Sequence, residues 1–98
     1  MNAHMWNRRY WVRHGAFTVD DYADMLVGGG FTLLERVEHR FAPQGHTMLY
    51  LLAESHFALH TFPEAGWDYV ELTSCNEAML LAFEKDFLAR AKARNAHV

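Results

Sequence analysis

The chain contains one cysteine and two prolines, and it has no long uninterrupted apolar run. A lone cysteine, Cys75, cannot form an internal disulfide, so we expect a reducing compartment, the cytoplasm. The apolar stretches are too short to span a membrane, and the N-terminus lacks the apolar segment of a signal peptide. A formal net charge of only −3 gives no reason to expect nucleic acid or an anionic membrane as a partner.

What the chain does contain is typical of a small folded unit. Its 98 residues are 51% hydrophobic and 14% aromatic, which predicts a single domain spanning 1–98. A unit of this size buries only a modest fraction of its surface. With three Trp and seven Phe to cover, it would gain from a partner, so we expect a homo-oligomer.

Periodicity and turn residues predict one strand, a helix, four strands and a final helix. The predicted strands are 5–13, 31–41, 47–53, 57–62 and 67–73. Thr18 is expected to cap a short helix that stops at the glycines 28–30, and Asn76 to cap the last helix. The residues that recur at helical spacing in this last helix include Ala78, Leu81, Ala82, Lys85 and Leu88. The order predicts an α+β two-layer sandwich, an antiparallel sheet with two helices on one face.

The turn at 63–66 allows a prediction of register. If this hairpin is centred on residue 65, Ser55 lies opposite Cys75 and His60 lies opposite Val70. A slip of one residue would turn the side chains to opposite faces. Ser55 and His60 are an odd number of residues apart, so an unbroken strand points them to opposite faces. Joint action would need a bulge near 54–56.

The polar residues Glu54, Ser55 and His56 are unusual within an apolar run, because buried polar groups need partners or a role. A serine hydroxyl can attack the preceding carbonyl, and elimination and hydrolysis of the resulting ester leave a pyruvoyl group. That ketone condenses with an amine as a Schiff base and withdraws electrons for decarboxylation. His60 could be the base and Cys75 the proton donor.

The residues alone leave other interpretations open. A strand histidine is more often a hydrogen-bonded core residue, and a single buried cysteine is more often a small hydrophobe. His56 and His60 have no third ligand at convincing spacing, so we expect no metal site.

Three blocks in register carry a family resemblance. The segments 39–45, HRFAPQG, and 54–64, ESHFALHTFPE, together with Cys75, resemble the prokaryotic S-adenosylmethionine decarboxylase proenzymes. The resemblance implies self-cleavage between 54 and 55 into chains 1–54 and 55–98, with Ser55 becoming a covalent pyruvoyl cofactor. It implies that His60 assists processing and that Thr47, where the family usually has serine, does the same. Cys75 would donate the proton during decarboxylation.

The resemblance also implies a small, amino-acid-type substrate and a homodimer with sites built from both subunits. Phe41 would stack on the adenine of S-adenosylmethionine, Glu64 would bind the ribose hydroxyls, and Glu54 would lie at the substrate. The product would supply aminopropyl groups for spermidine, a polyamine.

Several positions depart from the family pattern. The family's Thr-Cys-Gly is replaced by Ser74-Cys75-Asn76, Phe62 replaces a common Trp, and the usual Gly-x-His of the first strand is absent. Two alternatives therefore stay open. One is a pyruvoyl-dependent arginine or ornithine decarboxylase of the same fold, and the other is a non-processing regulatory paralogue.

Overall fold

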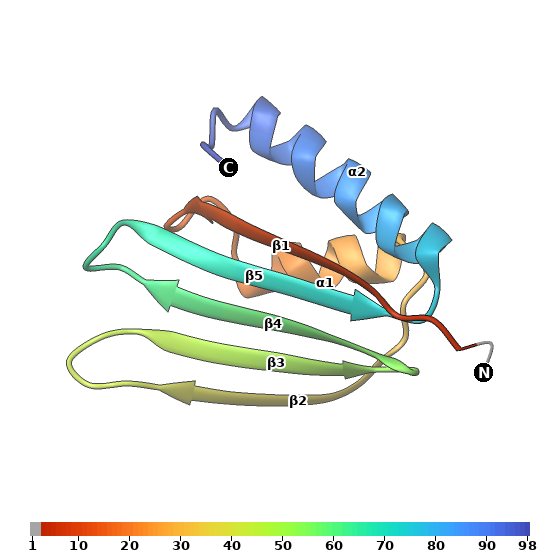
Figure 1. Cartoon of the computed structure of the whole chain (residues 1–98). Coiled ribbons are helices and arrows are strands. Elements are labelled where there is room, and N and C mark those ends of the chain that lie inside the picture. The colour runs from red at the N-terminus through yellow and green to blue at the C-terminus, as the bar shows by residue number, and fades with distance from the viewer. Residues whose placement is uncertain (1–2) are drawn as a thin grey trace.

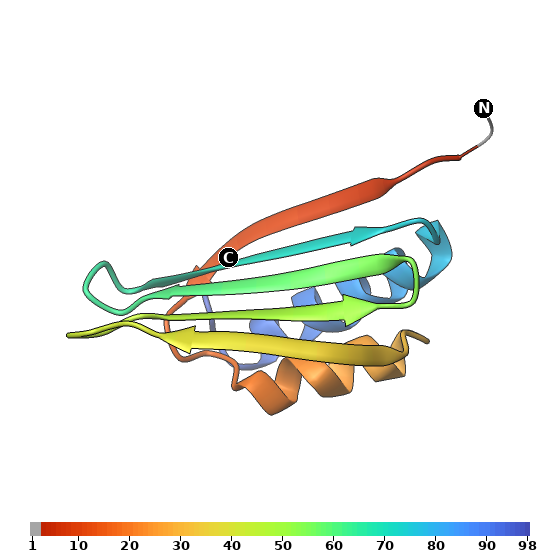
Figure 2. The same cartoon turned by 90° about the horizontal axis from the view of Figure 1, so that it is seen from below.

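The computed structural model describes residues 3–98, which form one antiparallel sheet and two helices. In chain order the elements are β1 (Trp6–Arg13), α1 (Val19–Gly28), β2 (Leu33–Arg40), β3 (His46–Leu52), β4 (Ser55–Phe62), β5 (Trp67–Ser74) and α2 (Glu77–Ala93). The strand order is β1-β5-β4-β3-β2, and every neighbouring pair is antiparallel. Both helices cover one face and leave the other open (Figures 1 and 2). The predicted α+β two-layer sandwich is confirmed.

Alternation along the strands divides the sheet into a helix-covered face and an open face. In β5 every second residue, from Asp68 to Ser74, is buried, while the residues between them face the open side. On the covered face Phe57 contacts the rings of Tyr22 and Phe83, with centroids 5.2 and 5.8 Å apart. The helices therefore hold β4 in place through one face only, and its other face stays free.

The buried stripe of α2 differs from the one that helical spacing suggested. Leu80, Phe83, Phe87 and Ala91 are buried, whereas Leu81 and Leu88 are among the exposed apolar residues. The reason is area: Phe83 and Phe87 stack on each other and contact the aromatic core, so turning them inward removes more apolar surface from water than turning two leucines. No helix between residues 3 and 98 is long and apolar enough to cross a membrane.

The hairpin register corrects the sequence-based prediction by one residue. The hairpin closes on the pair Phe62 and Trp67, which places Ser55 opposite Ser74 and His60 opposite Tyr69. The centre thus lies between residues 64 and 65, because four loop residues separate the closing pair. Strand β4 also begins at Ser55, earlier than predicted, and pairs regularly from there to Phe62 without the bulge that joint action of Ser55 and His60 required.

Thr18 caps the start of α1, as predicted, and forms a capping box. The Thr18 hydroxyl accepts from the backbone N–H of Asp21, and the Asp21 carboxylate accepts from the N–H of Thr18. Arg94, at the end of α2, donates to the same carboxylate at 2.9 Å. These contacts, the hydrogen bond from Arg94 first, lower the pKa of Asp21 to about 2. One carboxylate therefore caps α1 and links it to α2.

We expect Asp21→Asn to lower the melting temperature at pH 7 by roughly 2–4 °C. Because the folded-state pKa is lowered, the carboxylate stabilises the fold above about pH 4, and this contribution is lost as pH falls towards 2. The variant and the parent should therefore converge in acid. Thermal unfolding monitored by circular dichroism across this range tests it, with the exposed Asp20→Asn as control. A difference as large at pH 2 as at pH 7 would contradict the assignment.

Candidate active site

Ser55 lies at the start of β4 with its side chain on the helix-covered face. It is buried, and its hydroxyl donates to the Ser74 hydroxyl at 2.9 Å. Ser74 is fully buried. The neighbour of Ser55 across the strands is thus a serine and not the predicted cysteine, because of the one-residue change in register.

Glu54 and Cys75 come together beside this serine. Ala53 and Glu54 form the two-residue turn between β3 and β4, which closes on Leu52 and Ser55. Glu54 has a φ of 57°, in the left-handed region that costs a non-glycine residue conformational energy. The Cys75 thiol is exposed and donates to the Glu54 carboxylate at 3.5 Å. The peptide bond expected to break therefore follows a strained residue whose carboxylate contacts a thiol.

The strain at residue 54 can be measured by comparing Glu54→Gly with Glu54→Ala. Both variants remove the carboxylate, but only glycine adopts a positive φ without a steric cost from Cβ. We expect the glycine variant to be the more stable by about 1 kcal/mol, the reverse of the usual ranking of these residues. Chemical unfolding in a Ser55→Ala background, which keeps the chain intact, gives this difference. Greater stability of the alanine variant would contradict a left-handed residue 54.

Thr47 and His60 face each other on the open side of β3 and β4. The Thr47 Oγ1 lies 2.9 Å from His60 Nδ1. When Nδ1–H donates to the threonine, Nε2 keeps its lone pair and can act as a base. These two residues line a pocket of about 350 Å³ with Phe41, Gln44, Gly45, Thr61, Phe62 and Glu64. Four of the residues singled out from the sequence, Phe41, Thr47, His60 and Glu64, therefore share one pocket.

The remaining three residues lie at the other end of the strands. Ser55 and His60 are five positions apart on a regular strand, about 16 Å, and their side chains point to opposite faces. Glu54, Ser55 and Cys75 form one group, which we call the cleavage-site group. Phe41, Thr47, His60 and Glu64 form the second, which we call the pocket group. One chain does not bring the two groups together.

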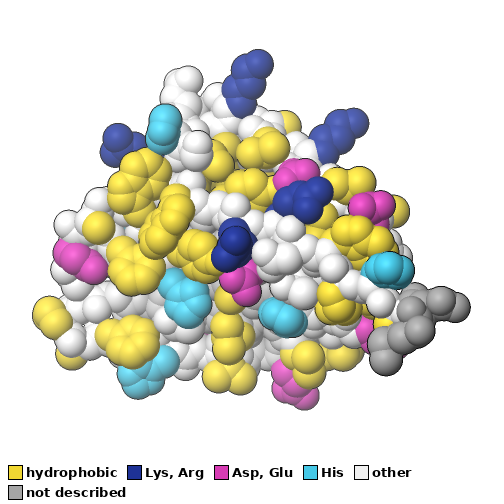
Figure 3. All heavy atoms as spheres, viewed as in Figure 1, with side chains coloured by type: hydrophobic (Ala, Val, Ile, Leu, Met, Phe, Trp, Pro, Cys, Tyr) yellow, Lys and Arg dark blue, Asp and Glu magenta, His cyan; other side chains and the backbone are white. Residues whose placement is uncertain are grey.

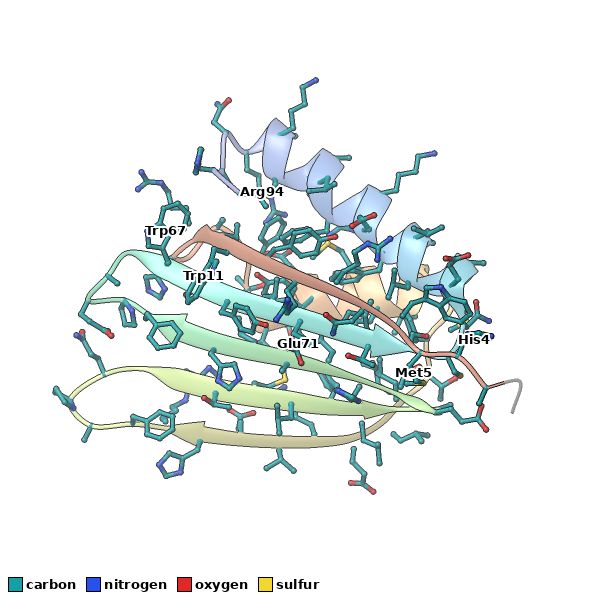
Figure 4. The ribbon with its side chains drawn as sticks, in the orientation of Figure 1. His4, Met5, Trp11, Trp67, Glu71 and Arg94 are labelled. Atoms are coloured by element: carbon teal, nitrogen blue, oxygen red, sulfur yellow. The ribbon has the colours of Figure 1, made fainter. Side chains whose placement is uncertain are left out.

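The open face between the groups is rich in exposed apolar side chains (Figure 3). Trp11 packs near Phe62 and Tyr69, with ring centroids 5.7 and 5.2 Å apart. Trp11, Phe62, Ala65 and Trp67 line a second hollow of about 510 Å³, and Figure 4 shows Trp11 and Trp67 on this side of the sheet. The sequence prediction assigned no role to Trp11. A tryptophan within the first predicted strand could have indicated an aromatic residue exposed on the sheet.

A polar group interrupts this apolar surface. The Tyr69 hydroxyl donates to Glu71 at 2.7 Å. Partial burial, together with this carboxylate, raises the pKa of the Tyr69 phenol above its usual value. Tyr69 pairs with His60 across β4 and β5, with ring centroids 6.1 Å apart. Because the pKa of the phenol is raised, Tyr69 is a neutral neighbour of the pocket group at pH 7.

Comparisons with known proteins identify the family. Residues 20–96 match the model of the family described as S-adenosylmethionine decarboxylase. The chain is 52% identical over 48 residues to an S-adenosylmethionine decarboxylase proenzyme of Synechococcus sp. (strain WH7803), covering 49% of this chain and 38% of that one. A proenzyme of the same name from Methanococcus aeolicus is 39% identical over 67 residues, covering 64% and 57% of the two chains.

A solved structure shares the fold. The adenosylmethionine decarboxylase from Aquifex aeolicus superposes with a TM-score of 0.66 at 21% identity, covering 92% of this chain and 82% of that one. The fold and the match over most of the chain define an α+β domain of the S-adenosylmethionine decarboxylase type, and the chain belongs to the S-adenosylmethionine decarboxylase family. The match covers only 38% of the length of the Synechococcus relative.

Proposed function

We propose that this protein is a self-processing, pyruvoyl-dependent decarboxylase that acts on S-adenosylmethionine and supplies aminopropyl groups for spermidine synthesis in the cytoplasm. The observation that carries the proposal is the turn at the expected cleavage site. A strained Glu54 precedes the buried Ser55, and the Cys75 thiol contacts the Glu54 carboxylate, in a chain of this family.

Self-cleavage would proceed through an ester of the chain itself. The Ser55 Oγ forms a bond to the Glu54 carbonyl carbon, the C–N bond breaks, and the Ser55 amine takes up the hydroxyl proton. Removal of the Ser55 Cα proton and rupture of the Cβ–Oγ bond release Glu54 as a carboxylate that keeps this oxygen. Water then replaces the nitrogen on Cα, ammonia leaves, and chain 55–98 begins with a pyruvoyl group. The strain at Glu54 favours the first step, because breaking the peptide bond releases it.

The pyruvoyl group would supply an electrophilic ketone that draws electrons from the substrate's carboxylated carbon. Around it, the chain's own residues bind and move protons. In the pocket group, the Phe41 ring offers a surface for a purine and the Glu64 carboxylate accepts hydrogen bonds from ribose hydroxyls. In the cleavage-site group, Cys75 is exposed beside Glu54 and can deliver a proton to the carbon that loses carbon dioxide.

We further propose a homodimer through the open sheet face, with each site shared between the two copies. The pocket group and the cleavage-site group lie at opposite ends of β3 and β4, about 16 Å apart. In this dimer the open faces of the two copies pack against each other, and the two-fold axis lies between them, perpendicular to the strands. The rotation reverses the strand direction, so the pocket group of one copy lies against the cleavage-site group of the other. The exposed apolar residues of that face would be covered, among them Trp11, Val37, Leu49, Leu51 and Phe62.

Mixed dimers test this arrangement. A Ser55→Ala chain and a His60→Ala chain should each stay uncut and inactive alone. Co-expressed, they form mixed dimers with one intact site, about a quarter of all sites at random pairing. We expect the His60→Ala chain, identified by its mass, to become cut after Glu54 in the mixture only. If neither chain is cut in the mixture while the wild type is cut, each site belongs to one chain.

The function itself is tested by the intact mass of the purified protein and by carbon dioxide release. We expect fragments 1–54 and 55–98, the second carrying the mass of a pyruvoyl terminus, and release from S-adenosylmethionine. Release from arginine or ornithine alone would instead support a decarboxylase of basic amino acids. An uncut chain after long incubation would support a non-processing paralogue, which the separation of Ser55 from His60 within one chain favours.

A further inference from the structure

Ser74 is a buried hydroxyl in direct contact with the oxygen that would attack the backbone. Its side chain is fully buried at the end of β5, and the register places it opposite Ser55. Sequence reasoning gave it no role, because the predicted register placed Cys75 there.

The hydrogen bonds of Ser74 determine which way the Ser55 proton points. The Ser74 Oγ accepts from the backbone N–H of Asn76 at 2.9 Å and donates to the Asn76 carbonyl at 3.2 Å. A hydroxyl has one proton and two lone pairs, so only one lone pair remains free. The Ser55 hydroxyl donates to it at 2.9 Å. Ser55 therefore directs its proton at Ser74, and both of its own lone pairs are left for other contacts.

Asn76 makes this orientation rigid. It is the N-cap of α2, and its side chain accepts from the Met79 N–H at 3.0 Å. Both backbone partners of the Ser74 hydroxyl thus belong to a residue anchored at a helix start. The Ser74 oxygen cannot turn away from Ser55 without losing its two bonds to Asn76.

We propose that Ser74 is a positioning residue for self-cleavage: it holds the Ser55 hydroxyl with its proton turned aside and its lone pairs free to reach the Glu54 carbonyl carbon. This rests on the proposed function. Ser74 acts on the first step, formation of the Oγ–C bond, and on no later one, because Oγ becomes part of the ester and finally of the Glu54 carboxylate. The hydroxyl proton ends on the Ser55 nitrogen, which leaves the Glu54 carbonyl carbon as an amine.

Ser74→Thr and Ser74→Val form the matched pair that tests the proposal, because the two side chains have nearly the same shape and differ in the hydroxyl. Cleavage is followed after in-vitro translation by denaturing gel and intact mass. We expect the threonine variant to cleave within about threefold of the wild type, and the valine variant at least about tenfold more slowly, as the loss of one hydrogen bond to a reacting group implies. Ser74→Ala, which adds no volume, should match valine.

Hydroxylamine identifies the blocked step, since it cleaves esters and leaves amides intact. The uncut valine and alanine chains should resist it, because the ester has not formed. Asn76→Ala keeps the Ser74 hydroxyl and both backbone groups that it bonds but removes the helix cap that anchors them, so it should lower stability and slow cleavage less than valine at position 74 does. Equal cleavage rates for the threonine and valine variants, or uncut chains that hydroxylamine cleaves, would overturn the role of Ser74 and leave the proposed function standing. A wild type that stays uncut overturns the proposed function, and the role of Ser74 with it.

Discussion

Replacement of Ser55 by alanine is expected to leave one uncut chain of 98 residues with no decarboxylase activity. The hydroxyl oxygen is the nucleophile of self-cleavage, and its bond to Cβ must then break before a pyruvoyl group can form, so no other residue substitutes for it. The fold should survive, because Ser74 keeps both of its bonds to Asn76 and loses only the one from Ser55. We expect a loss of stability of about 1 kcal/mol. Intact mass, carbon dioxide release and chemical unfolding measure the three effects.

His56→Gln is the matched control for this substitution. His56 is the next residue of β4 and points to the open face, so its replacement tests whether any change at this turn stops cleavage. We expect the His56 variant to be cut as the wild type is. A Ser55→Ala chain that is still cut after Glu54 would show that the backbone breaks by another route.

The largest effect on stability is expected for Phe57→Ala. Phe57 is fully buried on the covered face of β4, against Tyr22, Tyr50 and Phe83. Truncation of a buried phenylalanine typically costs about 3–5 kcal/mol, a large part of the roughly 5–15 kcal/mol that stabilises a small domain. The variant should unfold at a much lower denaturant concentration and, without the Ser55 substitution, should cleave poorly, because β4 also carries Ser55 and His60.

The control for Phe57 is Leu88→Ala on the outer side of α2. Leu88 is exposed, so its loss removes little buried area, and we expect a change below about 1 kcal/mol. Both variants are measured by chemical unfolding in a Ser55→Ala background, which excludes the effect of cleavage. A small effect at Phe57 would contradict its place in the core between β4 and the helices.

Local patterns were sufficient to predict much of the fold. Thr18 and Asp21 form a capping box whose chemistry depends on a few neighbouring residues, and the alternation from Trp67 to Leu72 indicates a strand with two distinct faces. The buried stripe of α2 was not predictable in this way. Whether Leu81 or Phe83 turns inward depends on the aromatic rings that other elements bring to the same place.

Motifs whose spacing is local to the chain also gave seven candidate site residues: Phe41, Thr47, Glu54, Ser55, His60, Glu64 and Cys75. Only the tertiary structure decided how they are divided, with four in a pocket at one end of the strands and three at the other. The reason is pairing geometry. The four-residue loop that closes on Phe62 and Trp67 fixes the register of β4 against β5. A shift of one residue in that register would place a different side chain opposite Ser55 and on the other face of the sheet.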